Sequence, residues 1–261
     1  MIKRKTYRYR KGDILDIEEY HDGRYGAPGK QRVKRAKPTE EQMRIVNALN
    51  KARRCRQRLL MYFKPGDLFA TWTYEEKNRP PDMEHALIDF QKAIRKVRTE
   101  YKKRGYELFW IRNIERGTKG AWHIHLIINE IGDTAGIIQQ AWKKGGTWSV
   151  EIRNSKQYDE DFTDLANYIT KDEHTTEEKK DGSRSKPRIR EASYSTSRNM
   201  PLPKPKVDKL CYWKKDPKPR KGYYIAKIYE GINPVTGYNY RRYTMIRLDG
   251  RASPRGETWK R

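Results

Sequence analysis

The stretch that most constrains the fold of this chain is residues 106–129, YELFWIRNIERGTKGAWHIHLIIN. In its second half the residues alternate along the chain: Trp122, Ile124, Leu126 and Ile128 with His123, His125, Ile127 and Asn129. A period of two is typical of a β-strand, and residues 108–115 show a similar alternation. Gly117 and Gly120 lie between the two segments, so the stretch predicts an antiparallel hairpin.

The predicted hairpin brings an acidic residue to a pair of histidines. If Glu115 lies opposite His123, then Asn113 lies opposite His125, and one face holds two imidazoles and a carboxylate. A single histidine on a strand is more often a surface residue than a ligand, but two at this spacing, facing an acid, favour a ligand set. We therefore expect Glu115, His123 and His125 to form a three-ligand site for a divalent metal, with coordination positions left open.

The charge of the chain predicts a polyanionic partner. The 261 residues include 59 Lys and Arg against 34 Asp and Glu, a net charge of +25, and nucleic acid is the usual partner of such a chain. No long apolar segment or amphipathic anchor is present, and the basic start MIKRKTYRYRKGD is not followed by an apolar run, so we expect neither a membrane partner nor a secretory signal. Two distant cysteines, Cys55 and Cys211, are consistent with a reducing cytoplasm.

The sequence divides into four expected segments. Residues 1–38 have little apolar periodicity and are expected to be a flexible basic arm, either a nucleic-acid contact or a solvated tail. Residues 39–65 are expected to form a basic helix with Thr39 as its N-cap, whose charges either contact the DNA backbone or face solvent. Residues 66–200 form the main domain. Residues 201–261 form a basic tail in which residues 223–248 predict a β-hairpin.

The main domain shows the order β-α-β-β-α-β. A strand over residues 68–74 precedes a helix capped by Asp82 and ending before Gly105; after the hairpin, a second helix begins at Asp133, and residues 147–152 form a strand. This order predicts an α+β, ferredoxin-like (RRM-like) antiparallel sheet with helices on one face. Ile124 and Leu126 belong to the buried face, so we expect the histidines on the other.

A third helix is expected over residues 161–172. Phe162, Leu165, Ala166 and Ile169 form its apolar stripe. Tyr168 and Lys171 lie about 60° apart and off this stripe, so packing does not require Tyr168, which is free to point at the open face of the sheet. Residues 173–187 are expected to be a polar loop and residues 189–198 an edge strand.

Several motifs resemble those of the HUH endonucleases, specifically the rolling-circle replication initiator (Rep) proteins. Residues 115–126, ERG…GAWHIHL, resemble the second motif of that family, with Glu115 in the place of its third metal ligand. Tyr168-Ile169-Thr170-Lys171 matches the YxxK motif that carries its nucleophilic tyrosine and lysine. Residues 69–73, FATWT, resemble the first-strand motif, although Trp72 stands where a smaller apolar residue is usual. The resemblance covers roughly residues 68–200.

The resemblance implies a replication initiator that nicks origin DNA. Tyr168, assisted by Lys171, would attack a phosphodiester to leave a 5′-phosphotyrosine link and a free 3′-OH, and would later rejoin the strands. Mg²⁺ or Mn²⁺ would be held by Glu115, His123 and His125. The expected partners are single-stranded or hairpin origin DNA and a host helicase and DNA polymerase, in the cytoplasm of a bacterial cell that carries a phage, a plasmid or an integrated element.

Two alternative functions are kept. A relaxase or single-strand transposase would share the site and act on other DNA. A non-catalytic RRM-like nucleic-acid-binding protein would share the fold, but predicts stacking aromatic residues in place of the two histidines and the glutamate, and forms no covalent adduct with DNA.

Overall fold

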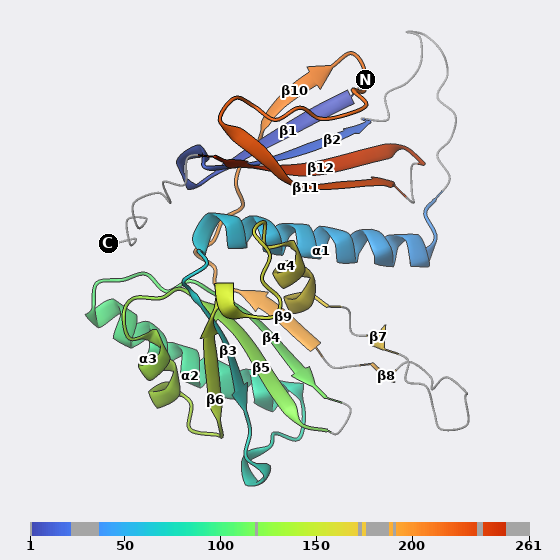
Figure 1. Cartoon of the computed structure of the whole chain (residues 1–261). Helices are drawn as coiled ribbons and strands as arrows, with labels where there is room; N and C mark the ends of the chain where they lie inside the picture. Colours follow the sequence, from blue (N-terminus) through green and yellow to red (C-terminus); the bar gives the residue numbers. More distant parts are fainter. Residues whose placement is uncertain are drawn as a thin grey trace. The chain divides into compact units, whose positions relative to one another are not determined.

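The computed structural model describes residues 2–21, 37–117, 120–171, 174–175, 188–189, 192–233 and 237–248 (Figure 1). The chain is an α+β protein with two five-stranded antiparallel sheets, as the fold class predicted. It divides into two compact units. One unit combines Met1–Met61 with Leu202–Gly256, and the other contains Tyr62–Pro201.

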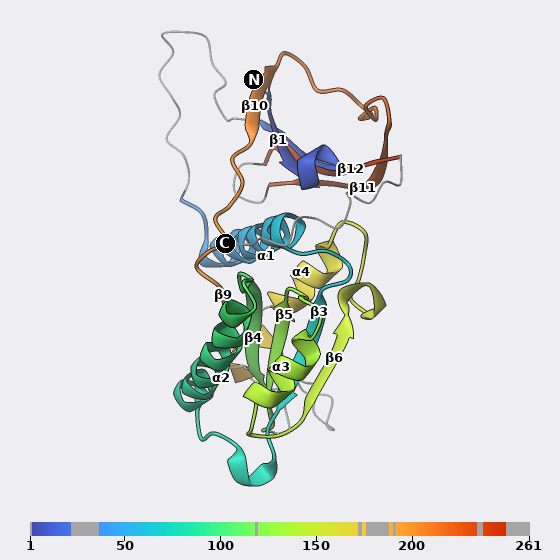
Figure 2. The same ribbon diagram turned by 90° about the vertical axis from the view of Figure 1, so that its left-hand side faces the viewer.

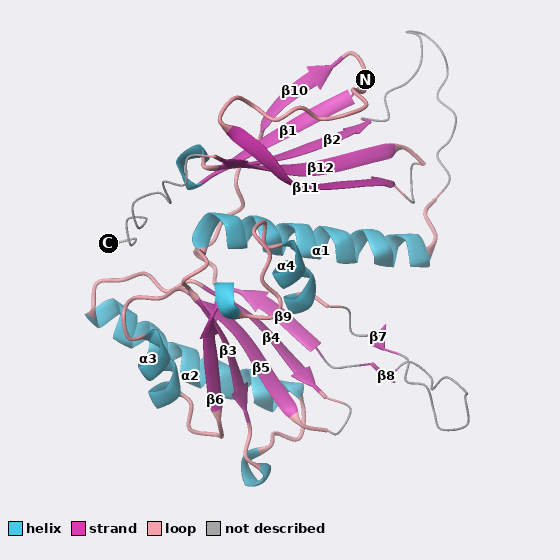
Figure 3. Ribbon diagram, in the orientation of Figure 1, coloured by secondary structure: helices cyan, strands magenta, loops and turns pink. Residues whose placement is uncertain are grey.

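The second unit has the predicted ferredoxin-like topology. Its elements are β3 (Leu68–Thr73), α2 (Met83–Lys103), β4 (Trp110–Arg116), β5 (Trp122–Ile128), α3 (Thr134–Ala141), β6 (Thr147–Glu151), α4 (Thr163–Ile169) and β9 (Ala192–Thr196), with short 3-10 turns at Glu76–Asn78 and Ile152–Asn154. The strand order β6-β3-β5-β4 places β5 between the two strands joined by α2, and β9 adds a fifth strand beside β4 (Figure 3).

Helices α2 and α3 cover the same face of this sheet (Figure 2). Trp72, Ile124 and Leu126 are fully buried there and share one core with Phe90 of α2 and Ile138 of α3. Asp82 caps α2 as expected, because its carboxylate accepts a hydrogen bond of 2.9 Å from the backbone N–H of His85. The alternation that predicted the strands therefore also predicted which face is covered.

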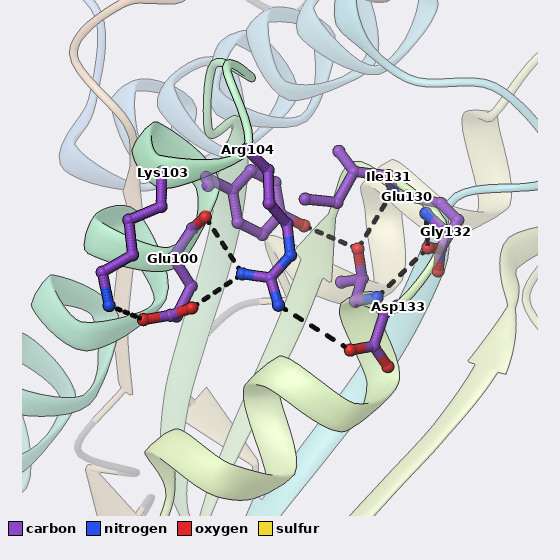
Figure 4. A network of polar contacts seen from close by, with 9 residues as sticks. Glu100, Lys103, Arg104, Glu130, Ile131, Gly132 and Asp133 are labelled. Atoms are coloured by element: carbon purple, nitrogen blue, oxygen red, sulfur yellow. Dashed lines mark hydrogen bonds and ion pairs between the residues drawn. The ribbon is translucent and has the colours of Figure 1, made fainter.

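The start of α3 differs from the expectation. Asp133 occupies the N-cap position, but its side chain makes no capping hydrogen bond. The Glu130 carboxylate accepts from the backbone N–H groups of Gly132 (2.6 Å) and Thr134 (3.2 Å) instead, while Asp133 lies 4.0 Å from Arg104 (Figure 4). The longer Glu130 side chain reaches the unpaired N–H groups of the first turn, so the carboxylate three residues upstream performs the capping.

The first unit corrects the expectation of a flexible arm over residues 1–38. Its strands are β1 (Ile2–Tyr9), β2 (Ile14–His21), β10 (Lys206–Leu210), β11 (Tyr223–Ile232) and β12 (Asn239–Arg247), with a 3-10 turn at Arg10–Gly12 joining the first two. They pair in the order β10-β1-β2-β12-β11, and residues 22–36 lie outside the described residues. The predicted C-terminal hairpin is β11–β12, and it joins this sheet by pairing with β2. The N-terminal strands thus find their partners about 200 residues away, which no local pattern reveals.

Helix α1 (Glu40–Tyr62) begins at the predicted cap. Gln42 N–H donates to Thr39 Oγ1 (3.2 Å), and Thr39 N–H donates to Gln42 Oε1 (2.9 Å), so the two residues form a reciprocal capping box. Two of its basic residues serve the unit itself: Arg56 lies 2.7 Å from Asp16, and Arg53 lies 3.2 Å from Glu18. They do not provide the DNA contact that was one of two expectations for this helix.

The remaining elements in the described part of the chain are β7 (His174–Thr175) and β8 (Arg188–Ile189), which pair with each other. Most of the polar loop expected over residues 173–187 lies outside the described residues. Within the described residues, no helix combines the length and apolar character needed to cross a membrane.

The buried pair of Arg56 and Asp16 should dominate the stability of the first unit. Both side chains are at most 1% exposed, so Asp16→Ala leaves a guanidinium buried without its carboxylate and should lower the free energy of unfolding by about 3–5 kcal/mol. Urea denaturation measures this loss. The exposed pair of Glu41 and Arg44 on the same helix is the control: Glu41→Ala should cost at most about 0.5 kcal/mol. Equal losses in the two variants would contradict this assignment.

Candidate functional site

The β4–β5 hairpin has the predicted register. Glu115 lies opposite His123, and Asn113 lies opposite His125. At the turn, the N–H of Gly117 donates to the carbonyl of Ala121 at 2.7 Å. This confirms the geometric basis of the candidate site: the carboxylate and the two imidazoles come from directly paired residues of neighbouring strands.

These residues lie on the face of the sheet opposite α2 and α3. His123 and His125 alternate with Ile124 and Leu126, which are fully buried in the core beneath those helices. We call the face that carries Glu115, His123 and His125 the site face. As predicted, packing of the apolar face places the polar side chains on the other one.

His125 is held at both ring nitrogens. Its Nε2 lies 3.1 Å from Glu115 Oε1, and its Nδ1 lies 3.1 Å from the hydroxyl oxygen of Thr71. Thr71 comes from β3, where it pairs directly with His125. The sequence interpretation assigned Thr71 to the strand alone, because the register between β3 and β5 has no local signal. The contact makes Thr71 a residue that orients His125.

The predicted metal ligands are partly assembled. Glu115 and His125 are in direct contact, and the His123 ring lies parallel to the His125 ring with centroids 6.3 Å apart. Within the described residues, however, no group of three or more His, Cys, Asp or Glu side chains is arranged to hold a metal ion. The donor types suit Mn²⁺ and, less well, Mg²⁺, but in this structure the carboxylate contacts one imidazole instead of sharing a ligand with both.

Tyr168 reaches this group from α4. The helix buries Leu165, Ala166 and Ile169, and is shorter than the expected range of 161–172. Tyr168 lies off this buried stripe, with its ring 5.6 Å from the His125 ring and 6.0 Å from Phe69, each in an edge contact. Lys171 follows the end of the helix, and its side chain is exposed. The structure therefore brings Tyr168, His125 and Glu115 together and leaves Lys171 at the surface.

The electrostatics of the site act on both Tyr168 and His123. Burial raises the pKa of the Tyr168 phenol above its ordinary value of 10, and the negative charge of Glu115 raises it further. Burial lowers the pKa of His123, as does the neighbouring His125, while Glu115 acts in the opposite direction. In this arrangement the phenol is protonated at neutral pH, so a positive charge near its oxygen is needed to favour the phenolate.

The two contacts of His125 predict its tautomer. A carboxylate only accepts hydrogen bonds, so neutral His125 must carry its proton on Nε2, facing Glu115, and accept from the Thr71 hydroxyl at Nδ1. Nitrogen-15 chemical shifts of the imidazole in metal-free protein should show this form. Thr71→Val, which removes the hydroxyl, should shift the Nδ1 resonance of His125, and Thr73→Val on the same strand should not. A neutral ring protonated at Nδ1 in the wild-type protein would contradict the assignment.

One comparison with known proteins identifies a family. Residues 67–173 match the family model described as Replication-associated protein, ORF2 type, which is less than half of the chain. Neither a curated protein nor a solved structure matches the chain. The matched segment runs from the start of β3 past the end of α4, and therefore contains every residue of the candidate site. The match supports a replication-initiator role for this chain.

Proposed function

We propose that this chain is a replication initiator endonuclease that nicks origin DNA by attack of Tyr168 and so starts rolling-circle replication. The observation that carries the proposal is the contact of the Tyr168 ring with His125, whose Nε2 lies 3.1 Å from Glu115. A nucleophile and two side chains of metal-binding type thus share one site, inside the segment that matches a replication-associated family.

The proposed reaction is a strand transfer. The phenolic oxygen of Tyr168 forms a bond to the phosphorus, the bond from phosphorus to the 3′-oxygen breaks, and the proton lost by the phenol is balanced by the one gained by the 3′-oxygen. The 5′ end stays linked to Tyr168, and the free 3′-OH primes a polymerase. Attack of another 3′-OH on the phosphotyrosine reverses the step and rejoins the strand. The bond energy is kept, and the sequence contains no GxxxxGK[ST] nucleotide-binding motif.

The raised pKa of Tyr168 defines what the other residues must supply. Lys171 follows Tyr168 by three residues, and we propose that its ammonium group binds the phosphate or the developing phenolate. Thr71 keeps the His125 ring in place through Nδ1, so that Nε2 is directed toward Glu115. These roles assign positioning to β3 and β5, and nucleophile and cation to α4 and the residues after it.

We propose Glu115, His123 and His125 as ligands of a divalent metal. The contact of Glu115 with His125 supports two of the three, since a carboxylate and an imidazole already converge there. Bound by these side chains, Mg²⁺ or Mn²⁺ polarises the scissile phosphate and offsets negative charge in the transition state.

The partners follow from the same proposal. Single-stranded or hairpin origin DNA is the substrate, which the net charge of +25 favours, and host helicase and DNA polymerase act on the product in a bacterial cytoplasm. A relaxase or transposase would use the same site, and the family match favours the initiator over both. A non-catalytic RRM-like protein predicts stacking aromatics in place of the His and Glu residues, whereas the site face carries all three.

Tyr168→Phe should abolish the covalent product. Wild-type protein incubated with Mn²⁺ and an origin oligonucleotide should give a protein–DNA adduct that survives SDS, and removal of the phenolic oxygen removes the attacking atom. The adduct is measured by gel electrophoresis with end-labelled DNA.

Tyr194→Phe is the matched control. Tyr194 lies on β9 directly opposite Asn113, so it projects from the same face of the sheet, and its variant should form the adduct at the wild-type level. An adduct retained in Tyr168→Phe and lost in Tyr194→Phe would assign the nucleophile to Tyr194.

Metal affinity should depend on Thr71. Residues that orient a metal-binding histidine typically contribute about 10- to 100-fold to affinity, so Thr71→Val should weaken Mn²⁺ binding by that factor, as measured by electron paramagnetic resonance titration. Thr73→Val, which removes the neighbouring hydroxyl on the same face, should bind Mn²⁺ like the wild type. Absence of stoichiometric Mn²⁺ binding by the wild-type protein with DNA present would refute the proposed metal site.

A further inference from the structure

We propose that Trp148 is a stacking platform for a nucleobase of the single-stranded DNA whose phosphate reaches Tyr168. The inference rests on the proposed function and adds to it a binding subsite outside the group of Tyr168, His125 and Glu115. It is carried by the position of Trp148 in the sheet, by its exposure and by its aromatic neighbours.

Trp148 lies on the site face at one edge of the sheet. Its strand, β6, is the terminal strand in the order β6-β3-β5-β4-β9. Trp148 pairs directly with Thr71, and Thr71 pairs directly with His125, so the three residues form one row across three strands. Adjacent strands are about 4.8 Å apart, which places the backbone of Trp148 about 10 Å from that of His125. A base held there belongs to a nucleotide close to the phosphate at Tyr168.

The Trp148 side chain is not part of the core. It is 55% exposed, whereas Trp72, Trp110, Trp122 and Trp142 are at most 8% exposed. The buried cluster beneath α2 and α3 includes those four residues and not Trp148. An exposed indole on an edge strand gains apolar contact area when a planar group covers it, so packing within this chain does not explain its presence.

Aromatic contacts connect Trp148 to the nucleophile. Its ring meets Phe69 in a T-shaped contact at 6.3 Å. Phe69 lies parallel to the His125 ring at 6.0 Å and touches the Tyr168 ring edge-on at 6.0 Å. Phe69 is 4% exposed, so this row is rigidly packed at its centre and open at Trp148. Rigid packing holds the indole at a set distance from the site.

A nucleobase is the occupant that the surroundings favour. The net charge of +25 attracts the phosphate backbone, and every base has a planar face that stacks on an aromatic ring whatever its sequence. Thr71 and His125 border the indole along its row with polar groups, which suits a base with polar edges better than an apolar protein surface. The expected ligand is therefore single-stranded DNA, bound without a requirement for origin sequence at this position.

The test uses oligo(dT), which lacks an origin, and the full chain carrying Tyr168→Phe, so that no cleavage intervenes. Trp148→Ala should weaken binding of labelled oligo(dT), measured by fluorescence anisotropy at one fixed salt concentration, by about 5- to 100-fold, as loss of one base–aromatic stack does. Trp148→Phe should keep most of the affinity. Tyr212→Ala removes an aromatic side chain that is 66% exposed in the other unit, and should leave binding unchanged.

Tryptophan fluorescence gives a second readout. Oligo(dT) should quench the emission of the protein with Trp148 intact, and the quenching should be lost in Trp148→Phe. Binding of Trp148→Ala within twofold of the parent, or quenching that persists in Trp148→Phe, would overturn the proposal.

Failure of the nicking proposal is distinguishable. If wild-type protein forms no adduct with any origin oligonucleotide but binding still depends on Trp148, the chemistry assigned to Tyr168 is wrong and the platform stands. If the adduct forms and binding is independent of Trp148, the platform alone is refuted.

Discussion

The candidate site depends on one register, the pairing of β4 with β5. A shift of one residue would move every side chain of a strand to the other face of the sheet. His123 and His125 would then lie beneath α2 and α3, and Ile124 and Leu126, which are fully buried, would leave the core. Each of these apolar side chains contributes about 1.5–3 kcal/mol through burial, so the core holds the register against such a shift. The polar site is thus positioned by the residues that it does not contain.

The same sheet explains how residues from distant parts of the chain meet. β3 lies between β5 and β6, so it brings Thr71 to His125 on one side and to Trp148 on the other. α4 docks through its own apolar stripe, and Tyr168, which lies off that stripe, meets His125 and Phe69. The helices that stabilise the sheet occupy the opposite face. The site face can therefore change its polar residues without changing the core.

The sequence predicted much of the second unit because its signals are local. Alternation predicted the hairpin and the pairing of Glu115 with His123, and the apolar stripe of α4 predicted that packing leaves Tyr168 free. The contact of Thr71 with His125 depends on a register between strands about 50 residues apart, and no local pattern reports it. The metal site was predicted from residue types in register, but side-chain conformation decides whether three donors converge, and here Glu115 contacts His125 alone. The first unit escaped prediction because β1 and β2 pair with strands from the other end of the chain.

In the first unit, charge plays the part that apolar alternation plays in the second. Glu19 of β2 is 1% exposed and accepts from Arg4 of β1 at 2.6 Å and from Arg241 of β12 at 2.7 Å. Both arginines are register partners of Glu19, so a slipped strand would leave a buried carboxylate without its cations. Removing one partner from such a network costs several kcal/mol, whereas the intact network adds little over an apolar core, so its main effect is on which strands pair. The basic residues of the first unit are therefore not simply a surface for nucleic acid. An arginine with a buried acidic partner is committed to the fold, and the exposed basic residues remain to attract a polyanion.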